Sequence, residues 1–236
     1  GAVFFGGQAA NVVFAMYIVG ILGAFLASAV YTKTIFKAED ASFVLELPPY
    51  RWPDMKTVLL ETWDKGKGYL IKAGTIILAM SVLIWFLSSY NMNGPVDDMS
   101  ESFLAALGGA MSVLFTFHGF DTWEAGSAVL TGIMAKEAVV STMGILYGLP
   151  DLSPDMDEAE MIATAAGSGL AAAFTPASAL AFMVFSQLYT PCMTALGTIK
   201  KETGSWYWMG FSAVSQFVIG WGVSLIVYRI ALAVGM

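Results

Sequence analysis

Charged residues are scarce in this sequence. They make up 12% of its 236 residues, whereas about 25% is usual for a soluble domain. Four stretches contain no Lys, Arg, Asp or Glu: residues 1–32, 73–96, 161–199 and 203–228. Because a helix needs roughly 20 apolar residues to cross the hydrocarbon core of a bilayer, each stretch is long enough to hold a span. The composition therefore predicts an all-α polytopic membrane protein.

Several other features are missing, and each absence excludes a class of function. The single cysteine, Cys192, excludes an internal disulfide and a four-cysteine zinc site. The single histidine, His118, excludes a histidine-rich metal site, so we expect it to be structural or at the surface. The net charge of −7 gives no support for nucleic-acid binding.

The sequence also lacks GxxxxGK[ST], so we expect no P-loop and no enzyme activity in this chain. It opens with glycine and without a basic region. We therefore expect a part of a longer or processed protein, without a signal peptide.

The basic residues are concentrated between two predicted spans, residues 10–31 and 73–90. Residues 33–72 hold seven of the eleven Lys and Arg residues, which places this stretch in the cytoplasm by the positive-inside rule. Residues 54–74 have apolar side chains at helical spacing and Asp54 as a cap, which predicts an interfacial amphipathic helix. We divide the chain into a transmembrane helix (1–36), a cytoplasmic linker with an amphipathic helix (37–72) and a second transmembrane domain (73–236).

Acidic residues dominate the stretch that follows the second span. Residues 91–124 contain five acids and no base, which indicates the outer side of the membrane. Within them, the apolar residues 103–117 are too few for a span and are better suited to a re-entrant or packed helix. Residues 206–228 form the last predicted span.

Two charged residues interrupt the apolar segment 123–148, which we predict to be helical. An ionisable residue deep in a span costs about 2.5–3.5 kcal/mol, so Lys136 and Glu137 are candidates for a functional site. Adjacent residues on a helix do not face each other, so the two side chains have separate partners or the helix is broken. Glu137 could ligate a cation, and Lys136 could hold a broken helix end or supply a counter-charge. The alternative is a tilted or re-entrant segment with the pair near an interface.

Prolines interrupt the apolar segment "FTPASALAFMVFSQLYTPCMTALGTIKKE" at two places. Pro191 removes a backbone donor and frees carbonyls that must line a cavity or be satisfied otherwise. The thiol of Cys192 next to such carbonyls suits a transition metal, although a buried cysteine that only packs is an equal alternative. Thr175 and Pro176 predict a second break, for which an ordinary loop is an equal alternative.

Three quoted stretches together resemble the membrane region of the bacterial ferrous iron transport protein B family. They are "ELPPYRWPDMKTVLLETWDKGKGYLIKAGTIILAMSVLIWFL" (46–87), "LTGIMAKEAVVSTMGILYG" (130–148) and "FTPASALAFMVFSQLYTPCMTALGTIKKETGSW" (174–206). The first is similar to the block that joins the two gate domains of that family, the second to the AKE helix of the second gate, and the third to its YTPC segment.

The resemblance implies a helical bundle of the gate-domain type with broken or re-entrant helices, one half of an inverted repeat. It implies transport of Fe²⁺ across the bacterial inner membrane, with no permanently bound cofactor. The partners it implies are the lipid bilayer and, elsewhere in the same protein, a GTPase domain and a first gate domain; a homo-oligomer stays open. On the matching positions we predict metal ligands at Cys192 and Glu137. The predicted pathway residues are Lys136, Thr190, Pro191, Thr175 and Pro176.

Two other classes of function remain. A gate-type transporter of an organic solute such as a nucleoside would need polar side chains in the spans, which offer few Asn, Gln or Asp. A non-transport membrane scaffold would leave Cys192 and Glu137 dispensable.

Overall fold

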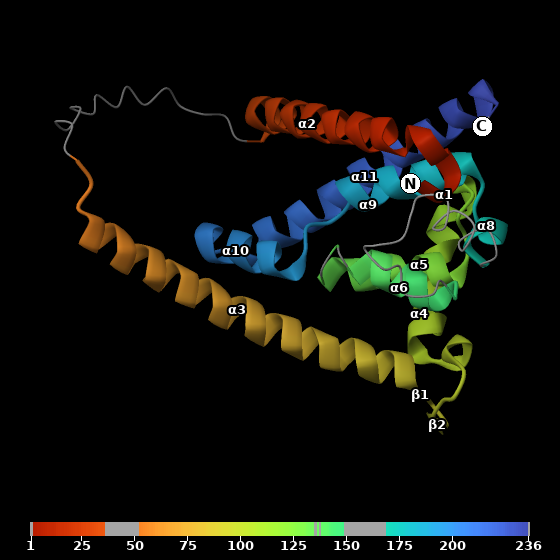
Figure 1. The fold of residues 1–236 in the computed structure, drawn as a ribbon, viewed down its shortest axis with the longest axis horizontal. Helices are drawn as coiled ribbons and strands as arrows, with labels where there is room; N and C mark the ends of the chain where they lie inside the picture. Colours follow the sequence, from red (N-terminus) through yellow and green to blue (C-terminus); the bar gives the residue numbers. More distant parts are fainter. Residues whose placement is uncertain (1, 36–51, 135, 137, 149–168, 236) are drawn as a thin grey trace.

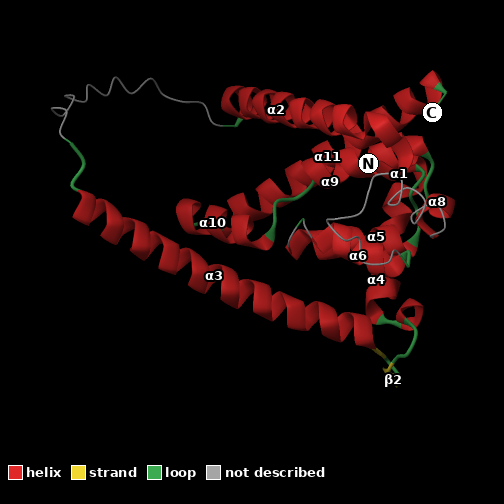
Figure 2. Cartoon of the chain, viewed as in Figure 1, coloured by secondary structure: helices red, strands yellow, loops and turns green. Residues whose placement is uncertain are grey.

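The computed structural model describes residues 2–35, 52–134, 136, 138–148 and 169–235. Helices make up almost all of this part of the chain, as the composition predicted (Figure 2). The described strands are the two-residue β1 (Tyr90–Asn91) and β2 (Gly94–Pro95), which pair antiparallel. Short helical segments are α1 (Ala2–Phe5), η1 (Gly6–Gln8), η2 (Met99–Glu101) and α8 (Gly169–Ala173).

Three described helical segments are long and apolar enough to cross a membrane. They are residues 6–34, which end with α2 (Ala9–Thr34), residues 176–203, and α11 (Trp206–Val234). The first and last predicted spans are confirmed, and each helix extends several residues beyond its predicted end.

Helix α3 (Met55–Ser89) joins the predicted amphipathic helix and the predicted second span without a break. Its 35 residues make it about 52 Å long, well beyond the roughly 30 Å of hydrocarbon. The predicted cap is confirmed, because the Asp54 carboxylate accepts hydrogen bonds from the Thr57 amide (3.2 Å) and hydroxyl (2.6 Å). One helix can therefore serve as both the interfacial segment and the span.

The apolar stretch before residue 120 forms a bent pair with the next helix. Helix α4 (Phe103–Ser112) continues into η3 (Val113–His118), and this segment meets α5 (Trp123–Met134) at 108°. Gly108 and Gly126 bring the two backbones together, since a Cβ on Gly126 would collide with the Gly108 carbonyl. The stretch is a packed helix, as its short length predicted.

His118 is fully buried in the core and has a structural role. Its Nε2 lies 3.0 Å from the Trp221 carbonyl and donates to it, and the Trp221 indole in turn donates to the Leu114 carbonyl at 2.8 Å. Aromatic rings surround it, with Phe115 and Phe120 at 5.7 and 5.5 Å between centroids. This cluster fastens η3 to α11.

The three membrane-length segments lie side by side. In Figure 1, α2 runs in the same direction as the consecutive helices α9 (Pro176–Leu188) and α10 (Met193–Thr203), and α11 runs back beside α9. The Tyr31 ring near the end of α2 packs on Phe211 near the start of α11, with 5.8 Å between centroids. The C-terminal end of α2 and the turn after α10, which follows Lys200 and Lys201, therefore lie at the same end of the molecule.

Candidate functional site: a hairpin tip against a broken helix

Residues 123–148 form two antiparallel helices, α5 and α6 (Ala138–Leu146). The hydroxyls of Thr122 and Tyr147 are 2.7 Å apart at the base of this hairpin, and those of Thr131 and Thr142 are 3.0 Å apart further along. The prediction of one helix with a charged middle is therefore wrong, and the broken-helix alternative is correct. Lys136 lies at the tip of the hairpin.

The hairpin closes tightly because residue 132 is glycine. A Cβ at Gly132 would collide with the Val139 side chain of α6 and with the Tyr189 hydroxyl. The absence of a side chain lets α5 approach both its partner helix and the end of α9.

The membrane-length segment 176–203 is broken near its middle, as Pro191 predicted. Helix α9 ends at Leu188, and α10 begins at Met193 after Cys192. The last turn of a helix has carbonyls without intrahelical donors, and Pro191 cannot supply one. The break therefore leaves backbone oxygens that need donors from elsewhere in the chain.

Lys136 supplies the missing donors. Its Nζ donates to the carbonyls of Gln187 (2.9 Å) and Tyr189 (3.3 Å), and it lies 5.1 Å from the centre of the Tyr189 ring. An ammonium group at a helix C-terminus also interacts favourably with the helix dipole. The expectation that Lys136 holds a broken helix end is confirmed by these contacts.

Three further contacts hold the break in place. The fully buried Tyr189 donates its hydroxyl to the Val129 carbonyl at 3.1 Å, and Thr190 donates to the Ala213 carbonyl at 3.1 Å. On the other side, Gly220 of α11 lies so close that an added Cβ would be 3.0 Å from the Tyr189 amide nitrogen. The broken segment is therefore fixed by α5 and α11 as well as by the hairpin tip.

Cys192 is half-buried at the residue before α10, and its side chain makes no capping hydrogen bond there. Lys136 contacts the carbonyl of Tyr189, three residues before Cys192, so the predicted site residues Lys136, Thr190, Pro191 and Cys192 lie in the same region of the structure. Glu137 lies outside the described residues. Within the described ranges, no three His, Cys, Asp or Glu side chains gather to hold a metal ion.

Thr175 and Pro176 lie at the other end of α9, about 20 Å away along the helix. The Thr175 hydroxyl accepts from the Ser178 amide, and the Ser178 hydroxyl accepts from the Thr175 amide. Both groups belong to an ordinary capping box with proline in the first turn. The structure does not bring this pair together with Lys136 and Cys192.

A cavity of about 410 Å³ adjoins the hairpin tip, between α2, α6 and α9. Lys136 and Gln187 line it together with Ser186, whose buried hydroxyl has no hydrogen-bond partner. The sequence analysis did not single out Ser186, Gln187 or Tyr189. Ser186 and Gln187 could have been found from the sequence, because they are the only non-aromatic polar residues in the apolar run 179–189.

A helical hairpin that meets a broken membrane-length segment beside continuous apolar helices is typical of one class of polytopic membrane proteins. In that class, discontinuous helices near the middle of the bilayer carry the sites for ions and solutes.

Comparison with known families agrees with this class. The family described as "Ferrous iron transport protein B C terminus" matches residues 13–65, and the Gate family, described as "Nucleoside recognition", matches residues 70–206. The chain belongs to the ferrous iron transport protein B family and corresponds to its C-terminal membrane region with a Gate domain. The family resemblance inferred from the three sequence stretches is confirmed.

Individual relatives come from bacteria and archaea. The Fe(2+) transporter FeoB of Staphylococcus aureus (strain MW2) is 40% identical over 228 residues, which cover 97% of this chain and 32% of the relative. The Fe(2+) transporter FeoB of Methanocaldococcus jannaschii is 35% identical over 224 residues, covering 92% and 31%. That of Salmonella typhimurium is 29% identical over 272 residues, covering 97% and 35%. The chain thus spans about a third of the length of these curated relatives, and no solved structure matches it.

Proposed function

We propose that this chain forms part of the membrane pathway of a ferrous iron transporter, and that Fe²⁺ passes the junction between the hairpin tip and the α9–α10 break. The contact of the Lys136 ammonium with the Gln187 and Tyr189 carbonyls carries the proposal. It shows a cation held by backbone oxygens halfway along a membrane-length segment. The names of the relatives support Fe²⁺ as the ion.

The chemistry of the junction suits a divalent transition metal. Backbone carbonyls and a carboxylate at Glu137 are oxygen ligands, and Cys192 adds a softer sulfur ligand that Na⁺ or Mg²⁺ would not favour. Thiolate and carboxylate would also neutralise the charge of the ion. Because these groups do not complete a coordination shell, water or the rest of the transporter supplies the other ligands.

The neighbouring residues have supporting parts in this proposal. Lys136 braces the break and so positions Cys192, while Thr190 and Pro191 shape the backbone beside it. Thr175 and Pro176 stay predicted pathway residues at the far end of α9, where they would contact the ion before or after it reaches the junction.

Uptake of Fe²⁺ into vesicles that contain the full-length protein tests the proposal. We expect Cys192→Ser and Glu137→Gln each to reduce uptake strongly, whereas Thr198→Ser on the exposed side of α10 should leave it unchanged. Normal uptake in both site variants would remove the proposed site and favour a scaffold role for this region.

An organic solute is the second candidate. The matched Gate family is described as "Nucleoside recognition", and the cavity of about 410 Å³ beside Lys136 has the size of a small-molecule site. Its lining is mostly apolar and rich in Met and Val, and its polar groups come from Tyr17, Lys136, Ser186 and Gln187. A nucleoside that inhibits Fe²⁺ uptake, or that the vesicles accumulate, would favour this candidate.

The setting of the pathway follows from the family. We propose that the full protein lies in the bacterial inner membrane, with residues 33–72 in the cytoplasm. We also propose that a GTPase domain and a first gate domain of the same protein complete the transporter. The first gate would provide a cysteine opposite Cys192. Association of several copies would be compatible with the large apolar surface of α2 and α11.

A further inference from the structure

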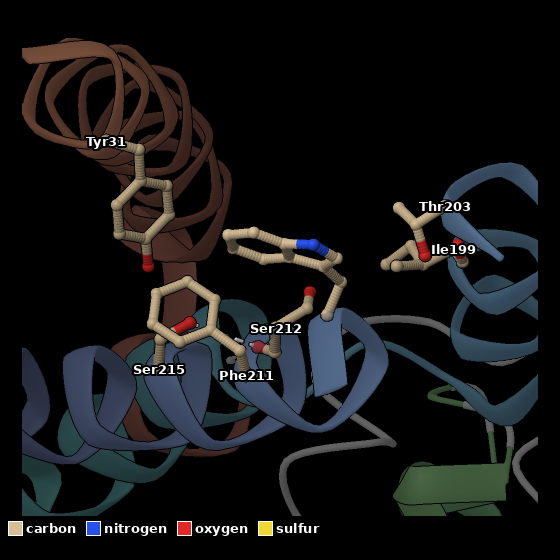
Figure 3. A pocket seen from close by; sticks show the side chains of 7 residues that line it. Tyr31, Ile199, Thr203, Phe211, Ser212 and Ser215 are labelled. Carbon is tan, nitrogen blue, oxygen red and sulfur yellow. Dashed lines mark hydrogen bonds between the residues drawn. The ribbon is translucent and has the colours of Figure 1, made fainter. Parts of the chain in front are cut away.

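A second cavity, of about 440 Å³, lies far from the hairpin tip, where three helix ends meet. Tyr31 of α2, Thr203 of α10 and Phe211 of α11 contribute to its wall. Figure 3 shows Tyr31 reaching from α2 toward Phe211, with Ile199 and Thr203 of α10 on another side. The complete lining consists of Tyr31, Ile199, Thr203, Trp208, Phe211, Ser212 and Ser215.

This second cavity, called the groove below, has a mainly apolar wall that also carries hydroxyl groups. The aromatic rings of Tyr31 and Phe211 pack edge to face, whereas Ser212 and Ser215 present polar groups from the same helix. The Tyr31 hydroxyl is buried but has no hydrogen-bond partner. A buried hydroxyl without a partner is costly, so the packing of Tyr31 against α11 is not fully satisfied in this part of the chain.

The mouth of the groove is positively charged. Lys33 lies in the last turn of α2, two residues beyond Tyr31, and Lys200 and Lys201 lie in the last turn of α10. Glu202 is the acidic residue in the last turn of α10, so the described residues at these two helix ends have an excess of two positive charges. Trp206 and Tyr207 follow at the start of α11, in the position of an interfacial aromatic belt.

We infer that this groove binds an anionic phospholipid of the bilayer, with one acyl chain along the apolar wall and the phosphate among the three lysines. A basic pocket between spans at the cytoplasmic surface is suited to anionic headgroups. Two features of the occupant are thereby specified: an apolar tail for the wall and a negative headgroup for the lysines. A zwitterionic lipid provides the tail without the net charge. The inference does not depend on which solute the protein transports.

Quenching of tryptophan fluorescence by brominated lipids tests this inference on the full-length protein in detergent. The probes are phosphatidylglycerol and phosphatidylcholine with the same brominated acyl chains, and the Trp208→Phe variant identifies the signal from the groove. We expect quenching of Trp208 at lower concentrations of phosphatidylglycerol. Equal affinity for the two lipids, or no quenching of Trp208 by either because another part of the protein fills the groove, would overturn the inference.

Charge variants then locate the headgroup. Lys33→Gln, Lys200→Gln and Lys201→Gln should each weaken phosphatidylglycerol binding about fivefold, as expected for one lysine at a membrane surface. Lys56→Gln at the exposed start of α3 is the matched control and should change nothing. Because the Lys33 side chain is exposed, the Lys33→Gln variant should fold like the wild type. An unchanged preference in the Lys33 and Lys200 variants would contradict the proposed headgroup site.

Discussion

The two proline-containing breaks at the ends of α9 have similar sequences but are stabilised differently. At the first, Thr175 and Ser178 satisfy each other's backbone groups, so the break depends only on neighbouring residues. At the second, the carbonyls of Gln187 and Tyr189 are satisfied by Lys136, which is more than fifty residues away in the sequence. A break of the first kind starts a helix, whereas a break of the second kind ties two membrane elements together.

Replacing the long-range donor should have the largest effect. Lys136→Met removes two hydrogen bonds worth roughly 1 kcal/mol each in a membrane protein, and a loss of about 2 kcal/mol corresponds to a roughly 30-fold shift in population. We expect a lower melting temperature of the full-length protein and the loss of most Fe²⁺ uptake. Lys136→Arg, which keeps the charge, should retain part of both. Wild-type uptake in Lys136→Met would show that the second break needs no distant donor.

Filling the close approaches around the second break should have the next largest effect. Gly132→Ala and Gly220→Ala each place a methyl group against Tyr189, and such overpacking typically costs about 1–3 kcal/mol. Gly222→Ala is the matched control on the same helix, since nothing lies within 4 Å of its added methyl. Thermal unfolding should separate the first two variants from the control. Equal stability of Gly220→Ala and Gly222→Ala would mean that the close contact between α11 and the backbone at Tyr189 does not stabilise the break.

Removing one hydrogen bond at each break compares them directly. Tyr189→Phe loses the bond to the Val129 carbonyl, and Thr175→Ala loses the capping box; each should lower the free energy of unfolding by about 1 kcal/mol. We expect Fe²⁺ uptake to fall further in Tyr189→Phe, because only that variant loosens the junction beside Cys192. A larger uptake defect in Thr175→Ala would reverse the roles given to the two ends of α9.

The smallest effect is expected at a local cap outside the membrane. The pKa of Asp54 is lowered because the Thr57 hydroxyl and amide donate to its carboxylate. The cap is therefore formed at neutral pH and is lost as the pH falls through this lowered pKa. Hydrogen exchange at the Thr57 amide should be faster in Asp54→Ala than in the wild type at pH 7, and the two should converge in acid. A difference that does not depend on pH would show that the charge of the carboxylate is irrelevant.

Local signals in the sequence predicted the first and last spans, the Asp54 cap and the break at Pro191, because each depends on composition or on neighbouring residues. The hairpin was harder to predict: α5 and α6 are both apolar, and the turn between them occupies only a few residues around Lys136. The meeting of Lys136 with Gln187 and Tyr189 joins positions far apart in the sequence, and no local pattern encodes such a pairing. The same limitation explains why the burial of His118 against Trp221 was not anticipated.

Labelling of Cys192 in the full-length protein tests the central claim most directly. Vesicles are treated with a maleimide in the presence or absence of Fe²⁺, and mass spectrometry of the Cys192 peptide measures the labelling rate. If the ion passes the junction of the hairpin tip and the broken helix, Fe²⁺ should slow the labelling of Cys192, and Mg²⁺ at the same concentration should not. Equal labelling rates with and without Fe²⁺ would contradict the account.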